Sequence, residues 1–233
     1  FTASNLTAEV NVRLQLTRLL SALVNTNQDL AISNFDAIAT DLIGNLEGII
    51  SLQLAPNGIV THVTDTTRNG AAIGYNILAD EKAKAVALKS IEERTHTIAG
   101  PLTLKQGGQA LIARLPIFIT TQGTENFWGF ATVLIDVEVL MANMNVGKAD
   151  ATIDLALRGK NASGETGAVF FGNPEVFESA SASAVVKLPY GSWEIGVVRK
   201  GGLPKHLLKW RFWVWLIGGC VTFAIAYIMY KMN

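Results

Sequence analysis

Two stretches in the middle of the chain decide the fold: QALIARLPIFI at residues 109–119 and FWGFATVLID at residues 127–136. Both are apolar runs enriched in aliphatic and aromatic residues, which favour β-strands. A short, mainly polar segment, residues 120–126, separates them. Since strands that follow one another closely pair antiparallel, we expect the two stretches to be neighbours in an antiparallel sheet.

Further strands and two helices are expected on either side of this pair, so that residues 46–145 form about five strands with helices at the edges. Asp80 is expected to cap the longer helix, because its side chain can accept hydrogen bonds from the first turn. The other elements are a hairpin of residues 49–54 and 59–63 about Pro56-Asn57-Gly58, a strand at 102–105 that turns about Gly107-Gly108 into 109–119, and helices at 80–94 and 137–144.

A smaller unit follows, in which polar turns separate four short apolar runs. Residues 159–164 are one of these turns, and Pro189-Tyr190-Gly191 is a tight turn between the last two runs. The predicted strands are residues 151–157, 168–171, 184–188 and 192–198. Residues 201–204 then lead into the C-terminal segment.

The N-terminal segment, residues 6–50, contains two glycines and no proline, and its apolar residues recur at steps of three and four. This spacing predicts a long helix. Leu16, Leu20, Leu23 and Leu30 also fit a loose heptad, and we expect this stripe at a parallel two-fold contact. Two alternatives are that the helix lies along the whole body, or that it is a pair of core helices with a break near residues 25–27.

The C-terminal segment contains 19 consecutive uncharged residues, Phe212 to Tyr230. As a helix this run would be about 28 Å long, close to the thickness of the hydrocarbon layer of a membrane. Tryptophans at its start and tyrosines at its end are typical of membrane interfaces. We therefore expect a transmembrane helix within residues 205–233. Lys205, Lys209 and Arg211 would place the globular side in the cytoplasm by the positive-inside rule.

Composition excludes several classes of function. Hydrophobic residues make up 49% and charged residues 16% of the chain, and the net charge is zero, which argues against a disordered chain and a basic nucleic-acid binder. The single cysteine, Cys220, excludes an internal disulfide. The three histidines lie far apart, and no phosphate-binding loop or Gly-x-Ser-x-Gly motif is present. We expect no enzymatic activity, no metal and no cofactor.

A series of short motifs, in order over about residues 46–199, resembles the CHASE domain. These motifs are LAPNG at residues 54–58, AAIGYNIL at 71–78, AGPLTLKQGG at 99–108, ARLPIF at 113–118, FWGF at 127–130, VFFG at 169–172 and LPYGSW at 188–193. The resemblance implies an α+β fold with a long stalk helix and two PAS-like antiparallel-sheet subdomains. It places the stalk at residues 1–45, a membrane-distal subdomain at 46–149, a membrane-proximal one at 150–204 and the transmembrane helix at 205–233.

The resemblance further implies a ligand site on the central sheet of the membrane-distal subdomain. The positions that correspond to it are Thr61, His62, Val63, Ala99, Gly100, Leu102, Leu111 and Arg114. Other polar candidates near it are Arg68, Asn69, Tyr75 and Gln106. Plant cytokinin receptors of this family have an aspartate near position 61, where this chain has threonine, which argues against cytokinin recognition.

The resemblance implies a function, that of a sensor anchored in the inner (cytoplasmic) membrane. Its globular part would lie in the periplasm, which overrides the cytoplasmic placement that the positive-inside rule gives. It would bind a small ligand and signal to a cytoplasmic output module. It would act as a homodimer or with partner membrane subunits, and it would bind no nucleic acid. The family also implies a membrane helix before Phe1 and an output module after Asn233. The alternative is a membrane-anchored accessory subunit that uses the fold for protein contact.

The apolar run 212–230 yields a first test. We expect the protein to stay in the membrane fraction after washing with high salt and with carbonate, because an uncharged helix of this length is stable only in lipid. Removal of residues 205–233 should give a soluble, folded protein. Release of the full-length chain by carbonate would contradict the transmembrane helix.

Overall fold

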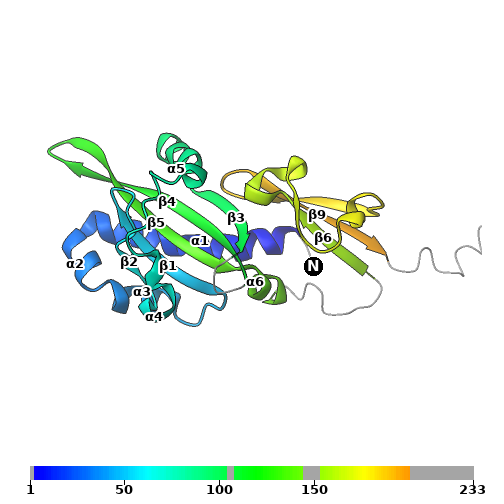
Figure 1. Cartoon of the computed structure of the whole chain (residues 1–233), viewed down its shortest axis with the longest axis horizontal. Coiled ribbons are helices and arrows are strands. Elements are labelled where there is room, and N and C mark those ends of the chain that lie inside the picture. The colour runs from blue at the N-terminus through cyan, green and yellow to red at the C-terminus, as the bar shows by residue number, and fades with distance from the viewer. Residues whose placement is uncertain (1–2, 104–107, 144–152, 200–233) are drawn as a thin grey trace, which may run out of the picture.

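The computed structural model describes residues 3–103, 108–143 and 153–199. Figure 1 shows an elongated molecule with two β-sheet units that lie side by side along one N-terminal helix. The larger unit contains a five-stranded sheet and the smaller unit a four-stranded sheet, and all strand pairs are antiparallel. The expected α+β class with two antiparallel sheets is therefore confirmed.

The first sheet has the order β2-β1-β5-β4-β3. Its centre is the long hairpin of β4 and β5. The turn of this hairpin is Gln122 and Gly123, and Thr121 and Thr124 are the paired residues on either side of it. Both turn residues have positive φ, the geometry that matches the twist of a two-residue hairpin. The strands are β1 (Ile49–Pro56), β2 (His62–Val63), β3 (Thr97–Thr103), β4 (Gln109–Thr121) and β5 (Thr124–Asp136).

The second sheet has the order β7-β6-β9-β8 and forms the smaller unit. Short 3₁₀ turns connect its strands, as the polar segments in the sequence predict. The strands are β6 (Ile153–Arg158), β7 (Val169–Phe171), β8 (Ala182–Lys187) and β9 (Ser192–Arg199), and the turns are η2 (Lys160–Ala162), η3 (Gly164–Thr166) and η4 (Pro174–Phe177).

The N-terminal segment is three helices rather than one long stalk: α1 (Ala3–Thr26), α2 (Gln28–Ser33) and α3 (Phe35–Ile43). The break lies at Asn27, whose backbone is extended and whose side chain accepts a 2.9 Å hydrogen bond from the amide of Leu30. Asparagine competes with helix continuation through this type of bond and caps the next helix instead. The chain therefore turns back at this point.

The remaining helices are α4 (Thr66–Asn69), the turn η1 (Gly70–Ala72), α5 (Glu81–Glu93) and α6 (Val137–Asn143). Asp80 caps α5, as predicted, and its Oδ1 accepts hydrogen bonds from the amides of Lys82 (2.8 Å) and Ala83 (2.9 Å).

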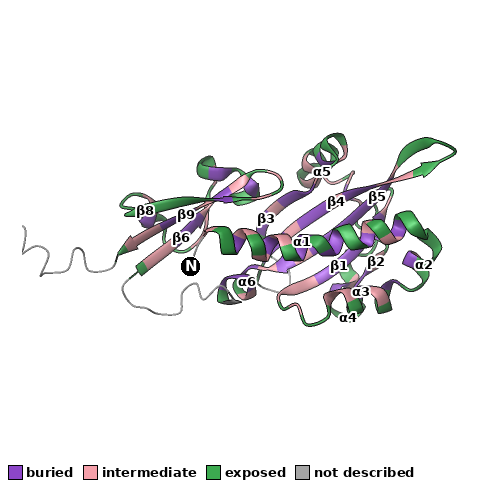
Figure 2. Ribbon diagram, turned by 180° about the vertical axis from the view of Figure 1, so that it is seen from behind, coloured by how far each residue is buried: buried purple, intermediate pink, exposed green. Residues whose placement is uncertain are grey.

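Helix α1 covers one face of the first sheet and continues to β8 of the second (Figure 2). Its buried face belongs to one continuous apolar core that also contains Val133 of β5 and Trp193 of β9. Leu16 and Leu20 lie in this core, and so they are not free to contact a second copy of the chain as the heptad suggested. The opposite face of α1 exposes Val12 and Leu19.

The other face of the first sheet is covered by α5 and by the segment between β2 and α5. A second, smaller apolar cluster fills this side; it includes Ala55, Val60, Val63, Ile77 and Phe130.

Two polar contacts join the units. The Gly100 amide donates a 2.7 Å hydrogen bond to Asn161 Oδ1, and the Lys89 ammonium lies 4.9 Å from the centre of the Tyr190 ring. Gly100 has φ +106°, and a Cβ there would approach the Ala110 carbonyl oxygen to 2.8 Å. This position therefore requires glycine.

The predicted membrane helix at residues 212–230 lies outside the described residues. Within residues 3–103, 108–143 and 153–199, no helix is both long and apolar enough to cross a membrane.

One buried histidine lies between α1 and the first sheet. Thr17 Oγ1 donates a hydrogen bond to the Leu14 carbonyl oxygen (2.7 Å), so that in the neutral tautomer His96 Nε2–H donates to Thr17 Oγ1 (2.8 Å). Burial, and then the positive charge of Arg18, lower the pKa of His96 to about 4.

This shift predicts a pH dependence of stability. The unfolded chain takes up a proton on His96 below its ordinary pKa of about 6.5, whereas the folded chain does so only near pH 4. The contribution of the neutral, buried His96 to the stability of the fold is therefore complete above pH 6.5, and it is lost as the pH falls towards 4. We expect the free energy of unfolding in urea to fall by about 2 kcal/mol more between pH 7.5 and pH 5 for the wild type than for His96→Gln. Equal slopes would contradict a neutral His96.

Candidate ligand-binding site

A row of polar side chains crosses the face of the first sheet that is turned away from α1. Gln53 of β1 is directly opposite Thr132 of β5, Thr132 is opposite Arg114 of β4, and Arg114 is opposite Thr97 of β3. Directly opposed residues in an antiparallel sheet point to the same side. All four are buried, which is uncommon for such residues in the middle of a sheet.

A cavity of about 120 Å³ lies on this face, between the strands and the segment that covers them. Most of the side chains around it are apolar, and three are polar. The residues that line it are Gln53, Val60, Ala72, Tyr75, Ile77, Ile112, Arg114 and Leu134.

The covering wall is held to the sheet and to itself by backbone hydrogen bonds. The Val60 amide donates to the Tyr75 carbonyl (3.0 Å), the Gly74 amide to the Val60 carbonyl (2.8 Å) and the Ile77 amide to the Gly58 carbonyl (2.8 Å). These bonds hold Tyr75 and Ile77, which line the cavity, to the segment that follows β1.

Arg114 is the most unusual group at the cavity. Its side chain is 6% exposed, and its Nε atom is buried with no hydrogen-bond partner among the described residues. The hydroxyl of Thr132, its neighbour in register, is likewise buried without a partner in that part of the chain. Buried polar atoms are nearly always paired, because each unpaired one costs about 1–3 kcal/mol.

A second buried arginine shows the ordinary arrangement. Arg13 of α1 is 0% exposed, and its Nη1 donates to the carboxylate of Glu9 (2.6 Å) and to the carbonyl oxygen of Glu9 (2.9 Å). Its Nη2 donates to the Glu47 carbonyl (2.8 Å), although Nε is unpaired here too. Arg13 is therefore explained by the fold itself, whereas Arg114 is not.

The electrostatics of the site centre on Arg114, Tyr75 and Asp80. Burial lowers the pKa of Arg114, and the Tyr75 hydroxyl and the Asp80 carboxylate act in the opposite direction. Burial also raises the pKa of Tyr75, and Asp80 adds to this rise. The pKa of Asp80 is lowered, first by the hydrogen bond from the Ala83 amide. An arginine keeps its proton in proteins, so the cavity has a cationic wall and a neutral phenol.

Of the predicted site residues, Arg114 lines the cavity, and two others lie on its face of the sheet. Val63 is opposite Gln53 in register and belongs to the apolar cluster on that face, and Ala99 is opposite Ile112.

The other five predicted residues do not converge on the cavity. Leu111 packs in the core on the opposite face, beneath α1, and the ring of His62 lies 5.5 Å from that of Phe35. Thr61 and Leu102 are exposed, and Gly100 bonds to the second unit.

Of the other polar candidates, one lines the cavity and two do not. Tyr75 lines the cavity, whereas Asn69 has a structural role, because its Nδ2 donates to the carbonyl oxygens of Ile50 (3.1 Å) and Thr64 (2.8 Å). Arg68 is exposed and lies 3.8 Å from Asp65. Gln106 lies outside the described residues.

Gln53 and Thr132 were not among the residues predicted from the sequence. Each is a polar residue inside an apolar strand, SLQLAP at residues 51–56 and FATVLID at 130–136. That pattern is the signal that could have found them, once the strands were placed in register.

A larger hollow of about 270 Å³ lies on the smaller unit, around Ile153, Ala182 and Val197. Its lining includes Ile153 and Arg199, the first and last described residues of this unit. Among the described residues, no buried, unpaired polar side chain lines it. The chemistry therefore favours the cavity of the larger unit. No group of three or more His, Cys, Asp or Glu side chains suited to a metal ion occurs within the described residues.

Comparisons with known proteins agree with this geometry. The model of the CHASE domain family matches residues 46–171. Among solved structures, an extracellular ligand-binding receptor from Desulfohalobium retbaense is 11% identical, with a TM-score of 0.64; the match covers 84% of this chain and 38% of that one. No curated protein shows a significant match.

Two further structures are chemoreceptor domains from Pseudomonas aeruginosa. The ligand-binding domain of PctC, in complex with GABA, is 16% identical with a TM-score of 0.54, and the match covers 85% of this chain and 94% of that one. The domain of PctB, in complex with L-Arg, is 15% identical with a TM-score of 0.55, covering 85% and 90%. At these identities the likeness shows a shared fold.

The two buried arginines allow a paired test of stability. We expect Arg114→Met to raise the free energy of unfolding by about 1–3 kcal/mol, because it removes a buried charge whose Nε has no hydrogen-bond partner among the described residues. Arg13→Met should lower it by about 2–3 kcal/mol, because it removes the three hydrogen bonds that the guanidinium donates to Glu9 and Glu47. Urea unfolding followed by tryptophan fluorescence measures both. A loss of stability in Arg114→Met equal to that in Arg13→Met would show that Arg114 is a structural residue.

Proposed function

The chain belongs to the CHASE domain family, and we propose that it is the extracytoplasmic part of a membrane-anchored sensor that binds a small ligand in the cavity of the larger unit. The observation that carries the proposal is the buried guanidinium of Arg114, which lines a cavity and whose Nε has no hydrogen-bond partner in the described part of the chain. Sensor, receptor and periplasmic roles are those for which this family and fold are used.

The cavity has the composition of a small-molecule site. Such sites are mostly apolar and contain a few polar groups that orient the ligand. Here Arg114, Gln53 and Tyr75 are the polar groups, and Ile77, Ile112 and others form the apolar wall. A ligand that pairs with Arg114 would offset the cost of burying its charge, and so the residue is better explained by binding than by folding.

The arrangement of the units supports an orientation in the membrane. Helix α1 contacts β8 of the smaller unit, and β9 ends at Arg199 on the same unit, so both ends of the described chain lie there (Figure 1). We propose that the smaller unit is nearest the membrane and that residues 205–233 anchor it. The sensor would act as a homodimer or with partner membrane subunits.

A route for a signal exists between the units. Arg114 is opposite Thr97 of β3, and three residues further along β3 the Gly100 amide bonds to Asn161. A ligand that changes the position of β4 and β3 would act on the smaller unit through this contact and through α1. It can shift the equilibrium between two arrangements only if its affinity for them differs.

The solved relatives support a small-molecule ligand at the level of the fold. PctC is in complex with GABA and PctB with L-Arg, and both are similar in fold to this chain. The competing function is an accessory subunit that binds protein and no small ligand; the same experiment separates the two.

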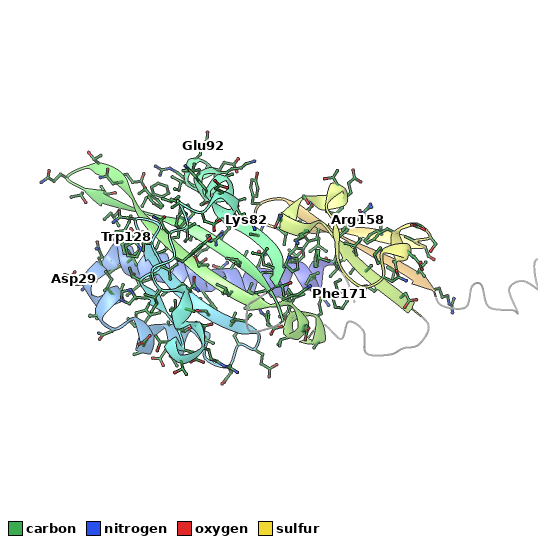
Figure 3. The ribbon with its side chains drawn as sticks, viewed as in Figure 1. Asp29, Lys82, Glu92, Trp128, Arg158 and Phe171 are labelled. Carbon is green, nitrogen blue, oxygen red and sulfur yellow. The ribbon has the colours of Figure 1, made fainter. Side chains whose placement is uncertain are left out.

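The test is thermal unfolding of the protein across a panel of metabolites, repeated with two variants. We expect at least one compound to raise the melting temperature of the wild type, and Arg114→Ala to abolish the effect. Arg158→Ala is the control, because Arg158 lies on the smaller unit (Figure 3), where its Nη2 pairs with Glu194 at 2.7 Å. Loss of the effect only in Arg158→Ala would place the site in the wrong unit. No stabilisation by any compound would favour the accessory subunit.

A further inference from the structure

The charge, size and lining of the cavity point to one class of ligand. Resting on the proposed function, we infer that the cavity binds a small organic monocarboxylate, whose carboxylate pairs with Arg114 and whose apolar tail contacts the aliphatic wall.

The charge of the cavity lining favours a ligand with one negative charge. Among the described residues that line the cavity, Arg114 is the only charged one, and none carries a carboxylate. Asp80, the nearest acid to act on Arg114, uses its carboxylate to cap α5 and to pair with Tyr75. An ammonium group in the cavity would therefore have no partner of its own, which disfavours amino acids and amines. A ligand with one negative charge balances the one positive charge of the described lining.

Volume limits the ligand to a few heavy atoms. An apolar cavity of about 150 Å³ holds one benzene molecule, and the cavity here has about 120 Å³. The cavity therefore has room for about six non-hydrogen atoms. Propionate, butyrate and pyruvate are of this size or smaller, whereas nucleosides and most amino acids are larger.

The lining favours a carboxylate over phosphate. A guanidinium offers a planar, forked set of donors that matches the two oxygens of a carboxylate. The Gln53 amide is the further donor in the lining, and beyond it the wall is Val60, Ile77, Ile112 and Leu134. A phosphate dianion would need more donors and a second positive charge, and it has no tail to contact that wall.

The test is calorimetric titration of the full-length protein in detergent micelles with matched compounds. Propionate and butyrate are the carboxylates, propionamide and butyramide are their neutral isosteres, and alanine is the zwitterion. We expect the carboxylates to bind at least about tenfold more tightly than the amides, because the charge-assisted pair with Arg114 is lost in the amide. Alanine should bind more weakly than propionate by a similar factor.

Variants locate the binding. Arg114→Gln should weaken butyrate binding by at least about tenfold, and Leu134→Phe, which fills the cavity and keeps the guanidinium, should weaken it as well. Arg68→Gln is the matched control, because this arginine of the same unit is exposed and points into no cavity, and it should bind butyrate as the wild type does. The near-ultraviolet circular dichroism of each variant checks its fold.

The outcomes separate this inference from the proposed function. If amides or amino acids bind as tightly as carboxylates and Leu134→Phe abolishes that binding, the sensor function stands and the monocarboxylate class is wrong. Butyrate binding that is equal in wild type and Arg114→Gln would also overturn the inference. If neither this panel nor the wider metabolite panel gives any binding, the sensor function fails with it.

Discussion

The packing of α1 across the backs of both sheets is the constraint on which the rest of the structure depends. Leu14 and Leu20 are buried in an apolar core that extends from β5 to Trp193 of the smaller unit. Because α1 occupies this face of the first sheet, the opposite face is left to α5 and the segment before it. That second side has only a small apolar cluster, and it is there that the cavity forms. The helix thus fixes the relation of the two units and the side on which a ligand can bind.

In the proposed sensor, the two buried arginines have different roles, one in stability and one in ligand binding. Arg13, on the α1 side, is tied to Glu9 and to a backbone carbonyl. Arg114, on the cavity side, is buried without such partners. A fold with a large core can tolerate the cost of one such group, and natural proteins retain destabilising residues where binding requires them. The large α1 core is consistent with this division, because it lies on the side of the sheet that the site does not use.

Local features could be predicted from the sequence, and long-range ones could not. The strands, the Asp80 cap and the two sheets follow from apolar runs and turn residues. The break at Asn27 depends on how the chain packs back on the sheet, and periodicity alone left it open. Leu111 and Arg114 are three residues apart in one strand, so alternation already places them on opposite faces. Gln53 joins the site only through its register with β5, a pairing between residues about 80 positions apart, which no local pattern specifies.

The position of the site in the sheet bears on how it would signal. Arg114 is on β4, next to β3, whose Gly100 amide is bonded to Asn161 of the smaller unit. A side chain on a loop could pair with a ligand and move without consequence, whereas one in a central strand moves with its hydrogen-bonded neighbours. Close-packed sheets and helices shift as units rather than deforming continuously. In the proposed sensor, pairing of a ligand with Arg114 would therefore bias the placement of the whole first sheet against α1, and α1 would pass that change to the unit nearest the membrane.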